Sequence, residues 1–294
     1  MKKIVLFMLA LALSAGTCLA AELEYFQVYK PKAGMSAEEI MQIKYFVKYT
    51  KFAHDAGFVG KAYYIDKSGS VRERGTLRRR INLGRKSDGL AYKDFNLFTS
   101  PVQVKGLGIL TWTYLDPKRD SEQWMWIPSL KKIRKTSQAQ ADDAFMGADF
   151  TTEEITTRKF EDETYKLAGE ENFKGYTSNF TKKTYYQGTP VFVIEARPKR
   201  AKWYYSKRIC YIDKATGGDI FDEIYDPNGK LYRTLFRSYE IYNVDGKEYP
   251  AQIIIEGQDL RTGHCTVIIN EKIAFDQGFS EDMFTERALA QSRW

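Results

Sequence analysis

Residues 124–154 read WMWIPSLKKIRKTSQAQADDAFMGADFTTEE, and this stretch decides which fold we expect. Its first four residues form a strand-like run that is apolar on both faces, unlike a strand of an antiparallel sheet with one wet face. Pro128 interrupts the run, four basic residues follow, and a loop leads to residues 145–150. None of it has the spacing of a catalytic motif. The pattern is typical of a wall beside a cavity and a loop that covers it.

The chain begins with the features of a secretory signal. Two lysines precede an apolar stretch over residues 4–13, and a small-residue cleavage site ends at Ala20. Thr17 fits poorly before Cys18 in a lipoprotein signal, so we predict that residues 1–20 are removed and that the exported protein is soluble. No later apolar run reaches the roughly 20 residues that span a bilayer.

Residues 21–294 show no repeat, low-complexity segment or proline-rich linker, and we predict a single domain. Loss of Lys2 and Lys3 with the signal lowers the formal net charge from +7 to +5. A basic surface suits anionic headgroups, so we expect transient contact with a membrane surface. Export argues against a nucleic-acid partner. The competing interpretation is that lysines and arginines only keep the protein soluble.

Two cysteines follow the signal, Cys210 and Cys265, and export permits a disulfide between them. Each lies in a strand candidate, and three further candidates separate the two. In a simple meander that separation is about 19 Å, at ~4.8 Å per strand, whereas a disulfide needs Cα atoms within roughly 7 Å. We therefore predict two buried free thiols.

Hydrophobic periodicity predicts a mainly β chain with a helix near each end. Ser36-Ala-Glu-Glu39 matches a capping box that opens a helix running toward residue 51, and a terminal helix is predicted over 280–290. Turns such as Asp226-Pro-Asn-Gly229 make the second half an antiparallel meander. The predicted strands cover 59–66, 71–83, 92–99, 109–115, 122–127, the surroundings of Ile133, 173–186, 190–197, 203–213, 219–226, 230–242, 249–257 and 264–274.

Three features of this pattern are less regular. Residues 137–152 have no period and predict a long loop, which in a compact domain is usually functional or mobile. Residues 153–165 are acidic and fit a short helix or a strand. In the strand over 71–83, Arg78 and Arg80 alternate with apolar residues, which predicts a basic row on an outer face.

The sequence has no pattern of a catalytic or metal site. His54 and His264 lie outside any metal-ligand spacing, and no local motif pairs a serine or cysteine nucleophile with a histidine. Gly106-Leu-Gly108 lacks the further glycine of a dinucleotide-binding loop. We predict no catalytic residue, no metal and no cofactor, and we expect that the protein is not an enzyme.

Two neighbouring strand candidates carry tryptophans and indicate a sheet that is covered on both faces. Trp112 and Trp124 alternate with Ile109 and Met125, so each strand has apolar side chains on both sides. In one interpretation helices pack on the sheet and leave no cavity. In the other, the second face lines an apolar cavity. The pattern alone leaves both open.

The opening stretch resembles the LolA-like family of outer-membrane lipoprotein-sorting proteins. The likeness lies in Gln123-Trp-Met-Trp-Ile-Pro-Ser-Leu-Lys-Lys-Ile-Arg134, followed by Phe145-Met-Gly-Ala-Asp-Phe150. Further pieces match in order: Lys105-Gly-Leu-Gly108 before Leu110-Thr-Trp112, Tyr205-Ser-Lys207, Asp226-Pro-Asn-Gly-Lys-Leu231, and Phe284-Thr285 with Arg287. Together they extend the resemblance over residues 36–294. It departs at Ala148, where the family pattern has serine, so any hydrogen bond from that hydroxyl is absent here.

The resemblance implies a fold and a function. The fold is an incomplete β-barrel, a large curved antiparallel sheet closed by a few helices over a hydrophobic cavity. The function is that of a soluble periplasmic carrier, which binds a lipid or the acyl chains of a lipoprotein and transports it across the cell envelope. Members of this branch are often associated with membrane transporters of the resistance–nodulation–division type, so an inner-membrane transporter is an expected partner. Each CH₂ group removed from water contributes about 0.8 kcal/mol, which lets a cavity hold a long chain without polar recognition.

On this basis we assign expected roles to three groups of residues. Lys132 and Arg134 are candidate headgroup contacts, because basic side chains pair with phosphate and other anionic heads. Phe145, Met146 and Phe150 are predicted to form the lid or mouth. The competing interpretation is ordinary core for each wall residue and a solvated face for each basic one. The predicted cavity wall consists of Leu110, Trp112, Trp124, Trp126 and Phe192.

Two other functions are considered. A non-carrier periplasmic adaptor would dock on a transporter of the same type, with a filled core and with Arg78/Arg80 and Lys131/Lys132 as docking surface. An envelope hydrolase would need an acid or a nucleophile that converges with others in a cleft, and no sequence pattern argues for one.

Overall fold

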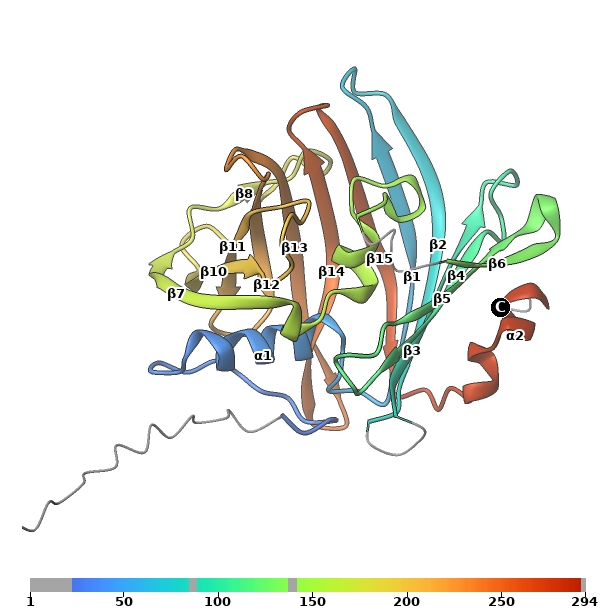
Figure 1. Cartoon of the computed structure of the whole chain (residues 1–294), viewed down its shortest axis with the longest axis horizontal. Coiled ribbons are helices and arrows are strands. Elements are labelled where there is room, and N and C mark those ends of the chain that lie inside the picture. The colour runs from blue at the N-terminus through green and yellow to red at the C-terminus, as the bar shows by residue number, and fades with distance from the viewer. Residues whose placement is uncertain (1–22, 85–88, 137–141, 292–294) are drawn as a thin grey trace, which may run out of the picture.

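A computed structural model describes residues 23–84, 89–136 and 142–291, so the predicted signal peptide lies outside the described residues. The main feature is one antiparallel sheet of thirteen strands that curves into an incomplete barrel (Figure 1). Its strand order is β6-β5-β4-β3-β2-β1-β15-β14-β13-β12-β11-β10-β7. In the described ranges the two end strands, β6 and β7, do not pair with each other, so the sheet stays open. The mainly β prediction, with a large curved antiparallel sheet, is confirmed.

Most of the described chain consists of strands joined by turns, with two α-helices. The helices are α1 (Ala37–Lys48) and α2 (Glu286–Gln291), and neither is long enough to cross a bilayer, nor is any other helix of the described residues. A second, two-stranded sheet consists of β8 (Tyr176–Thr177) and β9 (Thr184–Tyr185). The strands of the large sheet are β1 (Asp55–Ile65), β2 (Val71–Asn82), β3 (Leu90–Ser100), β4 (Gly108–Tyr114), β5 (Glu122–Ile127), β6 (Lys132–Thr136), β7 (Glu163–Asn172), β10 (Pro190–Pro198), β11 (Lys207–Asp213), β12 (Asp219–Tyr225), β13 (Leu231–Val244), β14 (Lys247–Asp259) and β15 (His264–Phe275).

Register shifts interrupt the pairing at several places, and such bulges bend and twist a sheet. One of them lies between Val59 and Gly60, where β1 pairs with β15. A Cβ atom on Gly60 would collide with the carbonyl oxygen of Ile269. Glycine therefore permits the close approach of the two strands at this bend.

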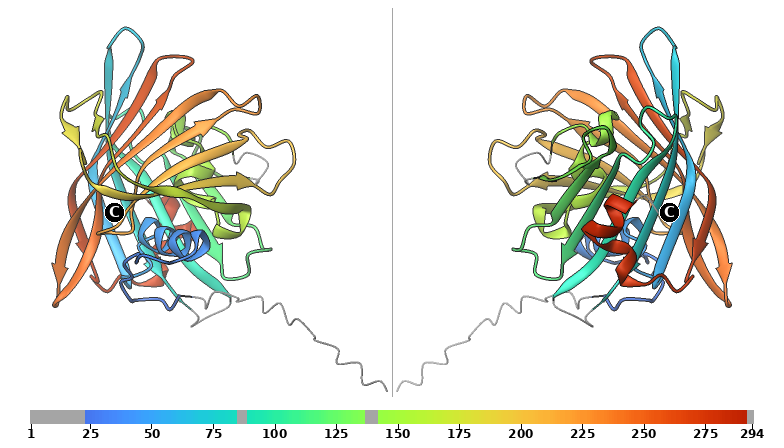
Figure 2. Two further views of the ribbon diagram at one scale, coloured as in Figure 1. Left: turned by 90° about the vertical axis from the view of Figure 1, so that its left-hand side faces the viewer. Right: turned by 90° about the vertical axis from the view of Figure 1, so that its right-hand side faces the viewer.

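The curved sheet has different covers on its two faces. Helix α1 and residues 142–162 lie on the concave face (Figure 1). On the convex face, α2 packs across β4, β5 and β6 (Figure 2). The segment with β8 and β9 packs across β11 to β15 and reaches β1. Both faces of the sheet carry covering segments, which explains why so many strands are apolar on two sides.

The N-terminal helix forms as its sequence predicts. Ser36 accepts a hydrogen bond from the backbone N–H of Glu39 at 3.2 Å, and the Glu39 carboxylate accepts one from the N–H of Ser36 at 2.7 Å. This reciprocal capping box satisfies two N–H groups that a helix start leaves unpaired. The apolar stripe of α1 is buried against the sheet, with Ile40 and Met41 fully inaccessible.

Two segments differ from their predictions. Residues 173–186 form no single strand, because Phe173 and Tyr176 pack across the convex face and turn the chain away from the sheet edge. The 153–165 segment, left open between helix and strand, contains a π-helical turn (Glu153–Thr157) and a 3₁₀ turn (Phe160–Asp162), and only its last residues enter β7. Local periodicity could not separate these cases.

The predicted basic row on an outer face is wrong. Arg80 lies opposite Asp94 in the pairing of β2 with β3, on the concave face, and it is buried in an ion pair with this carboxylate. Arg78 also pairs with Asp94, at 2.6 Å. Burial alone would raise the pKa of Asp94, but Arg78 and Arg80 lower it to about 2. Arg78 and Arg80 do alternate with apolar residues along β2, as predicted. They face inward because the buried carboxylate of Asp94 lies on that side of the sheet.

The two cysteines are free and buried, as predicted. Cys210 packs in the core under α1, whereas Cys265 belongs to the cluster on the convex side. Strands β12, β13 and β14 separate β11 from β15 in the sheet. Burial raises the pKa of both thiols.

Candidate functional site

The concave face of the sheet divides into two halves with different chemistry. Under α1 it carries a chain of buried ion pairs. Lys44 of α1 lies 3.1 Å from Asp219, Arg237 bridges Asp219 and Asp222 at 3.0 Å each, and Arg208 joins Asp222 to Glu163. All of these side chains are almost fully buried. Charged groups that satisfy one another in this way fix α1 in place and leave no room for an apolar ligand.

Glu163 is the carboxylate at the end of this chain of ion pairs. Burial alone would raise its pKa, but Arg208, at 2.7 Å, lowers it to about 2. The hydroxyls of Tyr45 and Tyr205 also donate hydrogen bonds to it. The carboxylate therefore stays ionised at neutral pH, as does its partner, and this half of the concave face is a structural element.

The other half of the concave face is apolar. Strands β1, β3, β4, β13 and β14 contribute side chains that pack against residues 142–157, which we call the cover segment. The cover segment contributes Phe145, Ala148, Phe150 and Ile155. We refer to this group as the apolar cluster, and it consists of Ala62, Tyr64, Phe98, Ile109, Phe145, Ala148, Phe150, Ile155, Tyr205, Ile224, Tyr232, Leu235 and Ile255.

A small cavity remains between the cover segment and the sheet. Its volume is about 60 Å³, and its lining includes Tyr64, Phe98, Phe145 and Met146. A water molecule occupies roughly 30 Å³ of liquid, and small-molecule sites usually have about 300 Å³ or more. A long acyl chain therefore fits only if the cover segment moves away from the sheet.

Few polar contacts hold the tip of the cover segment against the sheet. Arg74 of β2 donates a hydrogen bond to the carbonyl oxygen of Met146 at 3.2 Å. Thr266 of β15 donates to the Asp149 carboxylate at 2.7 Å and accepts from the Asp149 N–H at 3.0 Å. The ring of Phe150 occupies the space above Gly257, where a Cβ atom would lie 2.5 Å from it. The remaining contacts of the tip are apolar packing.

The far end of the cover segment is anchored more strongly. Glu154 pairs with Arg233 of β13 at 3.0 Å, and Glu153 pairs with buried Arg158 at 2.8 Å. Arg158 also donates to the hydroxyl of Tyr204 at 2.8 Å. Residues 153–158 are thus attached to the rest of the protein by an ion pair and a charged hydrogen bond, whereas residues 145–150 are held mainly by apolar contacts.

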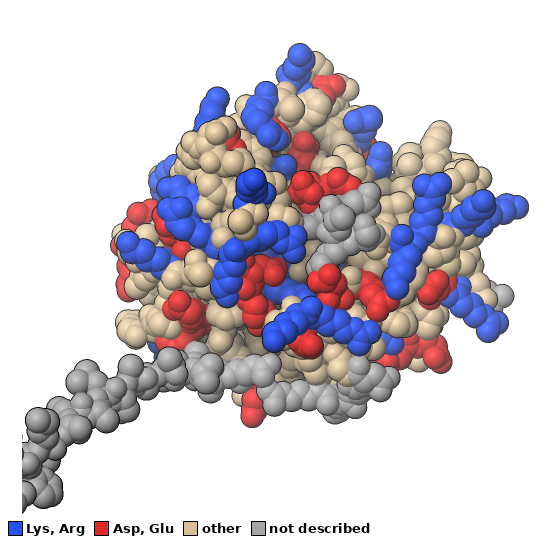
Figure 3. Space-filling view, in the orientation of Figure 1, with Lys and Arg blue, Asp and Glu red and all other residues tan. Residues whose placement is uncertain are grey.

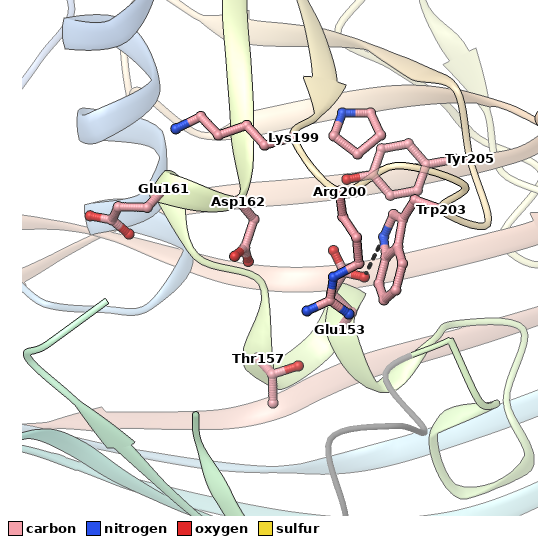
Figure 4. Close-up of a pocket in the computed structure, with 9 residues that line it drawn as sticks. Glu153, Thr157, Glu161, Asp162, Lys199, Arg200, Trp203 and Tyr205 are labelled. Carbon is pink, nitrogen blue, oxygen red and sulfur yellow. Dashed lines mark hydrogen bonds between the residues drawn. The ribbon is translucent and has the colours of Figure 1, made fainter. Parts of the chain in front are cut away.

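A second pocket of about 340 Å³ lies beside this anchored end (Figure 4). Its walls carry both carboxylates and cations, among them Glu161, Asp162, Lys199 and Arg200. The Trp203 indole N–H donates to Glu153 at 3.1 Å, drawn as the dashed line in Figure 4. A pocket with such a lining does not suit an acyl chain, and we assign it to the anchor of the cover segment.

The structure brings two of the predicted lid residues to the cavity. Phe145 and Met146 line it directly, and Phe150 packs in the same apolar cluster. Ala148, the departure from the family pattern, also lines the cavity, where its methyl group makes the wall more apolar than a serine would. Contact of these residues with a ligand remains a prediction.

The predicted wall residues lie elsewhere. Leu110, Trp112, Trp124 and Trp126 form one cluster with Phe284 and Leu289 on the convex face, beneath α2. Phe192 faces the concave side but packs in the core under α1. Their neighbours Ile109 and Met125, paired in register, point instead toward the apolar cluster. A role of the five predicted residues in lipid binding remains a prediction.

Lys132 and Arg134, the predicted headgroup contacts, are exposed on the edge strand β6. Arg134 pairs in register with Met125, and cross-strand partners share a face of the sheet. Both basic residues therefore lie on the side of the apolar cluster, at the open edge.

Sequence reasoning did not single out several residues of this site. Arg74, Tyr64, Ile255 and Ile268 belong to strands from the two ends of the chain, and only the pairing of β1 with β15 and β2 brings them together. The alternation of Ile109 with Leu110 in the sequence did indicate that β4 has two apolar faces. It did not indicate which one was concave.

A thirteen-stranded half-barrel with an apolar cluster under a cover segment has the LolA-like fold. A domain assigned to outer membrane lipoprotein sorting, from Vibrio parahaemolyticus, is similar over 86% of this chain and 98% of its own (TM-score 0.69, 22% identity). A DUF1329 family protein from Desulfovibrio piger gives a TM-score of 0.72 over 86% and 99% of the two chains, at 22% identity. A LolA superfamily protein from Nitrosomonas europaea gives 0.57 over the same shares, at 14% identity.

The fold predicted from the family resemblance is thus confirmed. A family model with the description "Uncharacterized protein" matches residues 92–291, about two thirds of the chain, and the chain belongs to that family. Among curated proteins no match was found.

Proposed function

We propose that this protein is a soluble periplasmic carrier that holds the acyl chain of a lipid or lipoprotein between the cover segment and the sheet. The observation that carries the proposal is the apolar cluster closed by a segment whose tip has few polar attachments. Similarity to structures named for lipoprotein sorting and for LolA supports it. The predicted secretory signal supports the periplasmic location.

The exchange is energetically reasonable. Opening the tip exposes Phe145 and Met146, and each fully exposed apolar side chain of this size costs roughly 1.5–3 kcal/mol. An acyl chain that enters gains about 0.8 kcal/mol for each CH₂ group it buries, so about a dozen groups outweigh the loss. Cargo affinity then depends on chain length, and the closed form protects the cluster from water when no cargo is present.

The polar end of the cargo would meet the open edge of the sheet. Lys132 and Arg134 lie there on the concave side, and we assign them contact with a phosphate or carboxylate head. We therefore propose an acylated anion as the cargo class. No reaction step is needed for this function, and we propose none.

Native mass spectrometry and a fluorescent fatty-acyl probe test this function. We expect co-purified lipid, or saturable probe uptake by the delipidated protein. The Arg74→Met variant should take up the probe faster, because it lacks the hydrogen bond to Met146. Absence of both bound lipid and uptake, in the wild type and in this variant, would count against a carrier.

The alternative is a periplasmic adaptor that docks on a transporter of the resistance–nodulation–division type without carrying cargo. The small volume of the closed cavity, about 60 Å³, favours it. Arg80 is buried and Arg78 is half-buried, and both pair with Asp94, so neither is available for docking. The exposed Lys131 and Lys132 remain. Changing both lysines to glutamate should abolish co-purification with such a transporter. The same change at exposed Lys174 and Lys183 should not.

A further inference from the structure

Two loops at one corner of the sheet present apolar side chains to solvent. Residues 101–107 connect β3 with β4, and residues 128–131 connect β5 with β6. Gly108 pairs with Trp126, so the two loops are neighbours. Val102 is 86% exposed and Leu130 49% exposed, at the tips of the two loops.

Both tips have ordered backbones that hold these side chains outward. The carbonyl oxygen of Pro101 accepts hydrogen bonds from the N–H groups of Val104 and Lys105, at 3.1 and 3.0 Å. Val104 itself packs inward against the apolar cluster. Leu130 ends a 3₁₀ turn that the hydrogen bond from the Lys131 N–H to the Pro128 carbonyl closes at 3.1 Å. The exposure of Val102 and Leu130 is therefore built into the fold.

The charge around these side chains has one sign. Residues 101–107 and 128–136, which we call the basic tip, contain no aspartate or glutamate. Lys135 pairs with Glu122, whereas the other four cations form no ion pair within the described residues. Figure 3 shows lysine and arginine side chains that project from the right-hand side of the molecule, where Figure 1 places β6. The five cations of the basic tip are Lys105, Lys131, Lys132, Arg134 and Lys135.

We propose that the basic tip docks on an anionic lipid bilayer, with Val102 and Leu130 inserted at the headgroup boundary and its cations among the lipid phosphates. Single exposed apolar residues are common on protein surfaces. Here two of them lie on adjacent loops, within a surface that carries five cations and no carboxylate of its own. Each Lys or Arg near an anionic bilayer strengthens attachment, and apolar side chains add a contribution that salt does not screen.

A protein partner fits this corner less well. A stable protein interface buries about 800 Å² on each partner, with closely packed contacts. The basic tip instead offers two apolar side chains, on separate loops, among charged ones. Lipids rearrange around such projections, so a bilayer needs no complementary shape.

The position of the basic tip gives the docking a direction. Val104, Leu107 and Met125 belong to the same loops and strands, and they pack against the apolar cluster. A bilayer bound at Val102 and Leu130 therefore lies beside the loops that pack against the apolar cluster. The docking proposal does not depend on what the cavity binds.

Flotation of the mature protein with vesicles tests the proposal without any acyl probe. Vesicles of phosphatidylcholine alone are compared with vesicles that also contain phosphatidylglycerol. We expect binding to the anionic vesicles, with weaker binding as salt rises from ~0.1 to ~0.5 M. Equal binding to both vesicle types, or no flotation with either, would overturn the proposal.

Two variants separate the apolar and the charged contributions. Val102→Asp with Leu130→Asp should weaken binding at least roughly tenfold. Lys105→Gln with Lys131→Gln and Lys132→Gln should weaken it roughly 100-fold. The matched controls are Leu167→Asp with Ile241→Asp, which are also exposed apolar residues, and Lys166→Gln with Lys174→Gln and Lys183→Gln. All sites are exposed, and circular dichroism verifies the fold of each variant.

The proposal fails if the tip variants float as well as the wild type, or if the controls lose binding to the same extent. Retention of the wild type on immobilised heparin without flotation would also overturn it, and would indicate an acidic macromolecule as the partner. Failure of acyl-probe uptake has no bearing on these outcomes, since the vesicles carry no probe. The two proposals are therefore tested separately.

Discussion

The guanidinium of Arg74 lies 3.2 Å from the carbonyl oxygen of Met146, and this hydrogen bond joins β2 to the tip of the cover segment. The same guanidinium stacks on the rings of Tyr64 and Phe98, with centroids 4.5 and 4.8 Å away. One side chain therefore links the cavity wall to its cover. Substitution of Arg74 alone therefore tests how firmly the cover segment is held against the sheet.

Replacement of Arg74 by methionine should loosen the cover segment. The hydrogen bond from a charged donor contributes about 1.5–3 kcal/mol, so we expect amide exchange of residues 144–151 to become about tenfold faster or more. Hydrogen-exchange mass spectrometry measures this rate. Arg72→Met is the control, because Arg72 lies two residues earlier on the same strand and is exposed. Equal exchange in the two variants would contradict the role of Arg74.

A methyl group at position 257 should displace the cover segment. Its Cβ would lie 2.5 Å from the Phe150 ring and 3.1 Å from the carbonyl oxygen of Asp149. We expect Gly257→Ala to lower the free energy of unfolding by about 1–3 kcal/mol, measured by urea denaturation. Gly169→Ala is the matched control, since no atom lies within 4 Å of its Cβ position, and its effect should stay within about 0.5 kcal/mol. A loss of equal size in both variants would exclude the steric explanation.

Acid should destabilise the fold through Asp94. Arg78 and Arg80 offset the burial of this carboxyl and lower its pKa from 3.8 to about 2. A lowered pKa stabilises the folded state above the unfolded value, and this stability is lost as the pH falls from about 4 through about 2. The loss is about 2 kcal/mol, measurable by urea denaturation at several pH values.

The matched variant for this pH dependence is Asp94→Asn. It leaves Arg80 buried without a charged partner, so it should be less stable at neutral pH by about 3–5 kcal/mol. Its stability should decline less between about pH 4 and 2 than that of the wild type, because the titrating group is missing. Parallel pH profiles of the two proteins would show that Asp94 is not the group responsible.

Ile109 and Leu110 distinguish the two faces of β4. Both are buried, Ile109 toward the apolar cluster and Leu110 under α2. We expect Ile109→Thr and Leu110→Thr to destabilise the protein similarly, but only Ile109→Thr to weaken acyl-probe binding, by about five- to tenfold, because its hydroxyl enters an apolar site. Loss of probe binding in folded Leu110→Thr would instead support the predicted wall of Leu110 and the tryptophans.

Thiol titration should distinguish the folded from the unfolded protein. Cys210 and Cys265 are buried with raised pKa values, so neither should react with a disulfide reagent in the native state. In concentrated urea without reductant both should react. The finding of no reactive thiol would show that a disulfide joins the two cysteines in the exported protein.

Local chemistry in the sequence predicted much of the fold. The capping box at Ser36 starts α1, and alternation over residues 122–127 gives β5 with the bounds that the structure has. Local signals failed where the path of the chain depends on distant partners. Residues 173–186 have strand-like composition, yet their aromatic rings find buried positions across the convex face.

The candidate site was predicted in part. Phe145, Met146 and Phe150 were found because the motif that contains them resembles the LolA-like pattern, and they do lie at the cavity or in its apolar cluster. Trp124 and Trp126 carried the strongest apolar signal, and they pack under α2. A large aromatic side chain is buried equally well under a helix on the convex face or beside a cavity on the concave face. Its size alone therefore cannot indicate a ligand site.

The sequence by itself determined the class of the fold, the start of α1, most strands and the covering of the sheet on both faces. Only the tertiary structure decided which face is concave. A strand has a side-chain period of two, so its pattern is unchanged when the faces are exchanged. The choice depends on groups far apart in the chain, such as Asp94 beside Arg80 and Phe150 above Gly257, and their contacts exist only once the sheet has curved.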